Sequence, residues 1–175
     1  LGLLASLENE AQIATVLAHE GAHFLEKHSA KQRVYRHNSQ GWAVATSMFV
    51  PFVGQLVAMN AMSGYSVEHE SEADEIGYER LKKAGFSTLE APRAFEILAR
   101  ETKANEDDAP YFFASHPKLQ VRIDNFIALN NNSDQNDGIV GFERYQEVVG
   151  PIRESMLEQK LSAGKVAAVL AALED

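Results

Sequence analysis

Two histidines one helical turn apart are the residues whose type and spacing most clearly indicate chemistry. They belong to the run His19-Glu20-Gly21-Ala22-His23. In a helix, side chains four residues apart project from the same face, so both imidazoles can reach one zinc ion. Glu20 lies about 100° round the helix, beside such an ion but not bound to it, where a general base for a water molecule belongs. The alternative is that the two histidines only cap a core.

A second segment, expected to form a helix over 66–84, supplies two carboxylates on its inward side. Glu70 and Asp74 share this side with Val67, Ala73, Gly77 and Leu81. The opposite side is typical of a solvated surface and holds Glu68, Glu72, Glu75 and Glu79. A carboxylate buried on an apolar face is costly unless a cation pairs with it, so this pattern requires a partner.

Zinc between the two helices provides that partner. We predict that Glu70 is the third ligand and that Asp74 accepts the remaining N–H of a ligating histidine, assigned here to His19. Three protein ligands leave a fourth position for water, which is typical of a catalytic zinc site. The alternative is a salt bridge from the two carboxylates to an arginine such as Arg80, Arg93 or Arg122.

The elements that must position these residues are predicted to be helices. The first covers 8–36, and its apolar residues, including Leu17, Phe24 and Leu25, predict a central, buried helix. The helix over 66–84 is closed by Gly85 at a C-cap position. Another helix begins at 87–90, which has the spacing of a capping box. Small residues within the site helices predict a close approach around the metal, with glycines that are merely tolerated as the alternative; they are Gly21, Ala22, Ala73 and Gly77.

The rest of the chain is also expected to be helical, with little or no β-sheet. A helix carrying Leu119, Ile123 and Phe126 precedes a polar linker. Beyond the linker we predict two short helices separated at Gly150-Pro151. These boundaries divide the chain into a metal-binding domain over 1–130, a linker over 131–140 and a helical appendage over 141–175.

Composition excludes some classes of function. The chain has no cysteine, so thiol nucleophiles and cysteine-rich zinc sites are excluded. A net charge of -9 and a pI near 5.1 argue against a nucleic-acid partner, because phosphate binding needs a basic face. The most apolar segment, 42–62, is interrupted by Pro51 and Gly54. We expect it to form a hairpin that packs or faces substrate, with membrane contact as the alternative.

Several short runs occur in an order typical of one known family. They lie at 9–12, at 19–23 with His28, at 70–77, at 84–86, and at 115–117 with Arg122 and Ile123. Together they resemble the HtpX and CAAX prenyl endopeptidase family over 3–127, and within it the soluble, extracytoplasmic BepA-like and OMA-like branch. The resemblance implies a mainly helical, gluzincin-type zinc metalloendopeptidase whose site is formed by His19, Glu20, His23, Glu70 and Asp74.

The resemblance also implies a substrate and a location. We expect a protein or peptide substrate, namely unfolded or misassembled proteins, and an extracytoplasmic location in the bacterial periplasm or at a membrane. A latent zinc-binding, chaperone-like module that holds client proteins is the alternative function. The upstream segment that the family usually carries, with an edge strand beside the cleft, is not found before Leu1.

Two further residues are predicted to act near the site. His116, before Pro117, either stabilises the oxyanion or occupies the open metal position and keeps the enzyme latent. The alternative is a loop histidine that caps the following helix. Arg122 is predicted to anchor that loop through a carboxylate, with a surface ion pair as the alternative. The remaining histidines are interpreted as structural or solvent-facing, because none shares the ligand faces, and they are His28, His37 and His69.

Overall fold

The computed structural model describes residues 2–34, 37, 66–104, 119–133, 138–164, 166 and 169–170 of the 175-residue chain. Its named elements are helices: α1 (Gly2–Ser6), α2 (Glu10–Leu25), α5 (Val67–Lys83), α6 (Glu90–Ala104), α8 (Leu119–Asn131) and α9 (Phe142–Ser162). Within the described ranges, strand-like pairing is limited to one β-bridge between Phe86 and Ile139. The mainly helical fold class predicted from the sequence is confirmed.

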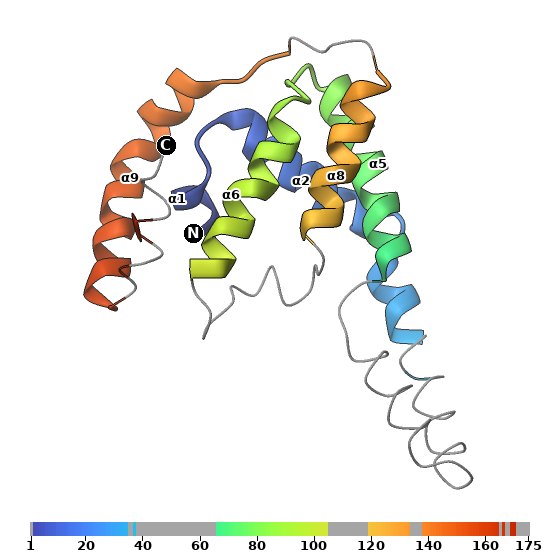
Figure 1. Cartoon of the computed structure of the whole chain (residues 1–175), viewed down its shortest axis with the longest axis horizontal. Helices are drawn as coiled ribbons and strands as arrows, with labels where there is room; N and C mark the ends of the chain where they lie inside the picture. The colour runs from blue at the N-terminus through green and yellow to red at the C-terminus, as the bar shows by residue number, and fades with distance from the viewer. Residues whose placement is uncertain are drawn as a thin grey trace, which may run out of the picture.

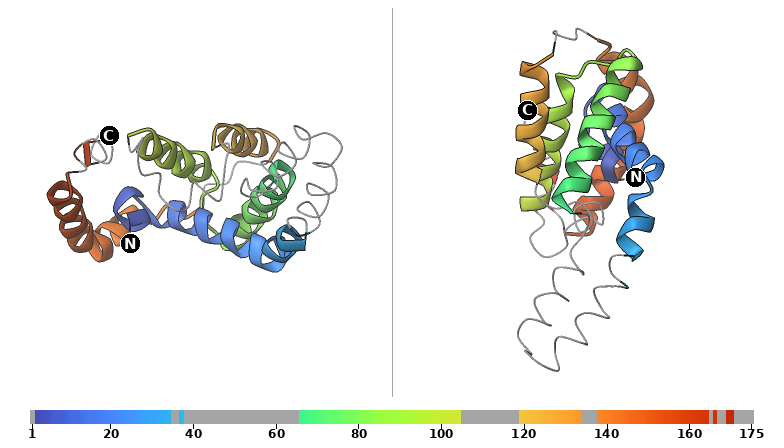
Figure 2. Two further views of the ribbon diagram at one scale, coloured as in Figure 1. Left: turned by 90° about the horizontal axis from the view of Figure 1, so that it is seen from below. Right: turned by 90° about the vertical axis from the view of Figure 1, so that its right-hand side faces the viewer.

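Helix α2 lies across one side of a layer formed by α5, α6 and α8 (Figures 1 and 2). It packs against α5 and α6, while α8 packs against those same two helices. Helix α9 packs on α1, at the end of the molecule away from α5 (Figure 1). The helix that carries the histidines is therefore held on one side by helices that follow it in the chain.

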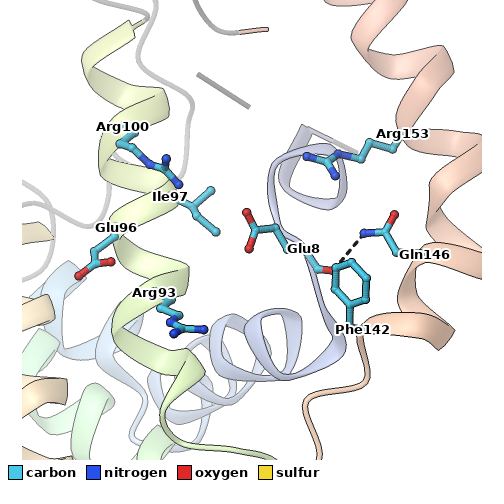
Figure 3. A pocket seen from close by; sticks show the side chains of 8 residues that line it. All are labelled: Glu8, Arg93, Glu96, Ile97, Arg100, Phe142, Gln146 and Arg153. Carbon is cyan, nitrogen blue, oxygen red and sulfur yellow. Dashed lines mark hydrogen bonds between the residues drawn. The ribbon is translucent and has the colours of Figure 1, made fainter. Parts of the chain in front are cut away.

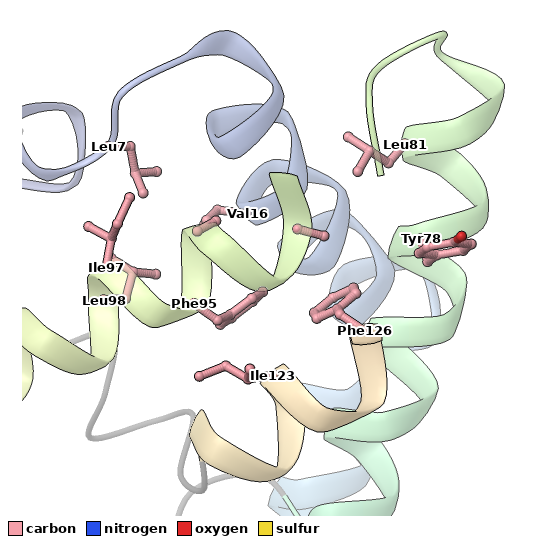
Figure 4. Close-up of a cluster of buried hydrophobic side chains, with 11 residues drawn as sticks. Leu7, Val16, Tyr78, Leu81, Phe95, Ile97, Leu98, Ile123 and Phe126 are labelled. Carbon is pink, nitrogen blue, oxygen red and sulfur yellow. The ribbon is translucent and has the colours of Figure 1, made fainter. Parts of the chain in front are cut away.

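A buried apolar cluster holds α2, α5, α6 and α8 together (Figure 4). Its members are Leu7, Val16, Tyr78, Leu81, Ala91, Ala94, Phe95, Ile97, Leu98, Ile123 and Phe126. Phe95 of α6 stacks on Phe126 of α8, with ring centroids 5.2 Å apart. Burying one such side chain stabilises the fold by about 1.5–3 kcal/mol, so this cluster fixes how α6 and α8 sit over α2.

The continuous helix predicted for 8–36 is wrong at two points. Helix α2 begins at Glu10, because the side chain of Asn9 accepts a hydrogen bond from the backbone N–H of Gln12 and caps the helix. It ends at Leu25, and Lys27 follows in the left-handed region with φ of 55°. Helical geometry resumes at residue 28.

Helix α2 is also not buried all round. Leu17 is 64% exposed and Phe24 is 82% exposed, and Leu25 is exposed as well. The reason is that α5 and α6 cover only one side of α2, and an apolar side chain on the uncovered side is left at the surface. The prediction of a central, buried helix therefore holds only for the side that carries the histidines.

Helix α5 ends as the sequence predicts. Gly85 has φ of 81°, and its N–H donates to Lys82 O at 3.0 Å, while the N–H of Phe86 donates to Leu81 O at 3.2 Å. This is the Schellman arrangement that favours glycine after a helix. The inward side of α5 is buried at Ala73, Gly77 and Leu81, whereas Val67 in the first turn is 36% exposed.

The capping box predicted at 87–90 is not formed. The N–H of Ser87 donates to Ile139 O at 2.9 Å, and α6 begins only at Glu90. The carboxylate of Glu90 instead accepts hydrogen bonds from Asn9 Nδ2 at 2.8 Å and Gln12 Nε2 at 2.9 Å. The start of α6 is therefore tied to the start of α2 through buried side chains.

Residues 138–140 join three elements through their backbone. The N–H of Ile139 donates to Gly85 O at 2.8 Å, and Val140 O accepts from the N–H of Ala11 at 3.0 Å in the first turn of α2. A Cβ added to Gly138 would lie 2.4 Å from the carbonyl carbon of Phe86, so only glycine fits there. The division into 1–130, 131–140 and 141–175 stays a prediction, with this part of the linker packed on the helices before it.

The break predicted at Gly150-Pro151 is wrong, because α9 runs through Pro151. Proline removes one hydrogen bond of the helix, but α9 is held to α1 on both sides of it. Tyr145 donates its hydroxyl to Leu4 O at 2.7 Å, and Arg153 donates Nε–H to Ala5 O at 3.0 Å. These tertiary contacts keep the helix continuous.

Several predictions fall outside the described residues. They concern the apolar segment 42–62 and the loop that carries His116. Among the helices that are described, none has the combination of length and apolarity needed to cross a membrane.

Candidate metal centre

Helices α2 and α5 cross closely where both carry candidate site residues. A Cβ added to Gly77 would lie 3.1 Å from His19 N and 3.2 Å from His19 Cα, so glycine allows the two backbones to meet. Ala22 and Ala73 are fully buried. The close approach predicted from these small residues is confirmed. Gly21 takes no part in it, since an added Cβ would meet nothing within 4 Å.

Three buried donors converge at this crossing. His19 Nε2 and His23 Nε2 are 3.0 Å apart, and the Glu70 carboxylate lies 3.6 Å from the first and 3.5 Å from the second. All three side chains are buried. A tetrahedral zinc ion with ligands at about 2.0–2.1 Å holds neighbouring ligand atoms about 3.3 Å apart. The spacing of the donors therefore fits one such ion.

Asp74 orients the ring of His19. Asp74 Oδ1 lies 3.0 Å from His19 Nδ1, and both side chains are fully buried. A carboxylate only accepts, so Nδ1 carries the proton and the lone pair of Nε2 points toward His23 and Glu70. Arg122 Nη2 lies 2.8 Å and 3.0 Å from the two ring nitrogens, which places it against the ring rather than on one lone pair. This pairing of Asp74 with His19 was predicted from the sequence.

Arg122 of α8 is 1% exposed and contacts both acidic residues of the site. Its Nη2 lies 2.7 Å from Asp74 Oδ1 and its Nη1 lies 3.3 Å from Glu70 Oε2. Its guanidinium carbon lies 4.0 Å from the centre of the Phe95 ring. Burial excludes the surface ion pair considered for this residue. The arginine pairing considered for the two carboxylates is formed together with the histidine cluster and not in place of it.

The charges at the crossing favour a bound cation. Asp74 and Glu70 bring two buried carboxylates, and Arg122 offsets one of their charges. With neutral imidazoles, one negative charge and two inward lone pairs are left at the point where the three donors meet. Such a group is costly inside a protein without a positive partner. The residues present therefore fit a divalent metal ion.

His28, interpreted from the sequence as structural or solvent-facing, is buried beside the candidate metal centre. It is fully buried, and its Nδ1 lies 2.9 Å from His23 Nδ1, while its Nε2 lies 3.0 Å from Glu72 Oε2. Glu72, assigned to a solvated face, is thus half-covered by this contact.

His69 stacks on His28 with ring centroids 4.4 Å apart. Burial is the largest cause of a lowering of the pKa of His69 below its ordinary value. His37 is exposed, as predicted.

Glu20 and His116 are the two residues predicted to act on substrate. Glu20 is half-buried on α2, between the two histidines in sequence and off the face that they share. His116 lies outside the described residues, so its role stays a prediction.

A separate cavity of about 670 Å³ lies between α6 and α9 (Figure 3). Its lining includes Glu8, Arg93, Arg100 and Arg153, and none of the residues of the candidate metal centre. The cavity therefore belongs to a different part of the molecule.

Comparison with known proteins places the chain in a family. Residues 1–129 match the family described as peptidase family M48. The putative β-barrel assembly-enhancing protease of Vibrio cholerae is 31% identical over 136 residues, which are 70% of this chain and 28% of that protein. The β-barrel assembly-enhancing protease of Escherichia coli is 25% identical over 130 residues, 66% of this chain and 26% of that protein.

A relative from a plant matches to a similar extent. The mitochondrial metalloendopeptidase OMA1 of Arabidopsis thaliana is 30% identical over 127 residues, 69% of this chain and 25% of that protein. The chain spans about a quarter of the length of these curated relatives. The chain therefore belongs to peptidase family M48, and the resemblance indicated by its motifs is confirmed.

Proposed function

We propose that this chain is a zinc-dependent metalloendopeptidase domain in which His19, His23 and Glu70 hold the ion. The observation that carries the proposal is the convergence of these three buried donors at 3.0–3.6 Å from one another. Membership in peptidase family M48 supports a metal-dependent peptidase. When bound, the ion supplies a Lewis acid that polarises the scissile carbonyl and lowers the pKa of a water molecule to about 7.

Glu20 is the general base in this proposal. It takes a proton from the attacking water as the new C–O bond forms, and it gives that proton to the amine as the C–N bond breaks. Its place beside the ligands, but off their shared face, lets it reach the water without binding the ion. Because water is the attacking group, no covalent acyl-enzyme is formed.

The surrounding residues hold the ligands in place. Asp74 fixes the ring orientation and the tautomer of His19. Arg122 of α8 pairs with both Asp74 and Glu70, and its positive charge stabilises their two negative charges in the buried site. His116 is proposed either to stabilise the oxyanion or to occupy the open metal position as a latency ligand.

Unfolded or misassembled proteins are the proposed substrates, and an extracytoplasmic compartment or a membrane surface is the proposed location. The names of the Vibrio cholerae and Escherichia coli relatives refer to β-barrel assembly, and the name of the Arabidopsis relative refers to mitochondria. A quality-control peptidase is compatible with both kinds of name. Membrane contact through 42–62 is the alternative to a hairpin that packs or faces substrate, and flotation of the chain with liposomes tests it.

The test compares metal content with turnover in the full chain. Zinc per chain is measured by mass spectrometry of the metal, and cleavage is measured on casein as an unfolded substrate. Glu20→Gln is expected to keep one zinc ion per chain and to lose cleavage. His23→Ala and Glu70→Ala are expected to lose both the metal and the activity.

The controls separate the proposal from its alternatives. Glu75→Gln removes a carboxylate from the exposed side of α5 and is expected to retain zinc and activity. A Glu20→Gln chain that still cleaves casein would refute the role of Glu20. A parent chain that binds zinc and unfolded casein but never cleaves it would instead indicate the chaperone-like module.

A further inference from the structure

The turn after α2 brings a third histidine back to the metal centre. In a continuous helix, His28 would lie five residues beyond His23 and about 140° away round the axis. Lys27 adopts the left-handed conformation with φ of 55° and breaks that continuity. This conformation is unfavourable for a residue other than glycine. The result is that the ring of His28 lies against the outer edge of His23.

The hydrogen-bond partners of His28 fix the direction of each proton. Glu72 Oε2 lies 3.0 Å from His28 Nε2, and an ionised carboxylate only accepts, so Nε2 donates. His28 Nδ1 is then an acceptor, and at 2.9 Å it accepts the proton on His23 Nδ1. That assignment leaves the lone pair of His23 Nε2 directed at His19 and Glu70. The reverse assignment would place an unprotonated nitrogen against the Glu72 carboxylate.

His28 therefore serves His23 and is not itself part of the donor cluster. Its contact is with Nδ1 of His23, on the side of the ring opposite the nitrogen that faces His19 and Glu70. The ring is 0% exposed and also stacks on His69, so it has little freedom to turn. The two candidate histidine ligands thus have matching support, since His19 has Asp74 directly and His23 has Glu72 through His28.

We propose that His28 and Glu72 are positioning residues that set the tautomer and orientation of His23 for metal binding. The inference rests on the proposed function, in which His23 is a ligand. Partners of this kind typically change metal affinity by about 10–100-fold when they are removed. A histidine buried only for packing would change the stability of the metal-free chain and leave the affinity for metal unchanged.

The first experiment measures zinc affinity of the full chain by competition with a chelator, together with the melting temperature of the metal-free chain. His28→Leu introduces an apolar side chain of similar size that has no hydrogen-bond acceptor, and this variant is expected to bind zinc about 10–100-fold more weakly. His28→Asn places an oxygen near the position of Nδ1 and is expected to restore most of the affinity. Glu72→Leu is expected to weaken zinc binding. The control is Glu75→Leu, on the exposed side of the same helix, which is expected to leave zinc binding unchanged.

The second experiment reads the tautomer directly. Long-range proton–nitrogen NMR of the metal-free parent is expected to show His23 with its proton on Nδ1, a signature that His28→Leu loses. This measurement on the parent holds even if a variant fails to fold. Zinc affinity of His28→Leu equal to that of the parent, or a His23 proton on Nε2 in the parent, would overturn the proposal. A parent that binds no zinc at all would instead defeat the proposed function.

Discussion

Arg122 and Asp74 form the best-connected ion pair of the candidate metal centre. Arg122 Nε lies 3.1 Å and 3.2 Å from the two carboxylate oxygens, and Nη2 lies 2.7 Å from Oδ1. Both side chains are almost completely buried. Because Asp74 also contacts His19, this pair links α8 to the helices that carry the donors.

Replacing Arg122 with Met is expected to destabilise the metal-free chain strongly. Asp74 and Glu70 would then be buried without a permanent cation, and breaking a buried pair in this way costs about 3–5 kcal/mol. Zinc should recover part of this loss, since it supplies a positive charge at the same place. Urea unfolding with a chelator and with zinc measures both effects.

Arg93→Met is the matched control for that variant. Arg93 pairs with Glu90 at 2.9 Å, but its side chain is 68% exposed, so the expected loss is about 1 kcal/mol or less. Equal losses for the two variants would contradict a special role of the buried pair.

Gly77→Ala is expected to push α2 and α5 apart and to weaken zinc binding. The new methyl group would lie 3.1 Å from His19 N, against backbone that cannot move alone, and overpacking of this kind typically costs about 1–3 kcal/mol. Gly21→Ala is the control, because its Cβ meets nothing within 4 Å. It should keep or raise stability, by up to about 1 kcal/mol, through helix propensity. Thermal melts and zinc titration distinguish the two, and a Gly77→Ala chain with unchanged zinc affinity would argue against the close crossing.

Gly138→Ala is expected to disrupt the backbone pairing of 138–140 with 85–87. Its Cβ would lie 2.4 Å from Phe86 C and 2.5 Å from Phe86 O, which no small adjustment relieves. Ile139→Ser is the comparison, because that side chain is 57% exposed and its backbone bonds stay intact. Hydrogen exchange at the amide of Ala11, which donates to Val140 O, should accelerate in the first variant and not in the second.

Tyr145 is expected to make stability fall at alkaline pH. Burial raises the pKa of its hydroxyl to about 12 from 10.0, despite the nearby charge of Arg153. A group whose pKa is higher in the folded state contributes stability below its unfolded pKa. That contribution is therefore present below pH 10.0 and is lost as the pH rises from there toward about 12. Unfolding between pH 9 and 12 measures it, and Tyr145→Phe should remove this part of the pH dependence.

Local rules were enough to identify the residues of the candidate site. The 3.6-residue period alone puts His19 and His23 on one face, and Glu70 and Asp74 on the inward face of a second helix. The same rules predicted Gly85 at the end of α5 and glycine at the crossing of the helices. These features depend on neighbours in the chain, so the sequence contains them directly.

Only the tertiary structure decided what lies around those residues. Lys27 turns His28 onto His23, Arg122 reaches Asp74 from 48 positions away, and Glu90 binds α2 instead of capping its own helix. Helix α9 passes through Pro151 because contacts with α1 hold it on both sides. A buried polar or charged group takes whichever partner the packing brings near, and helical periodicity carries no information about partners on other helices.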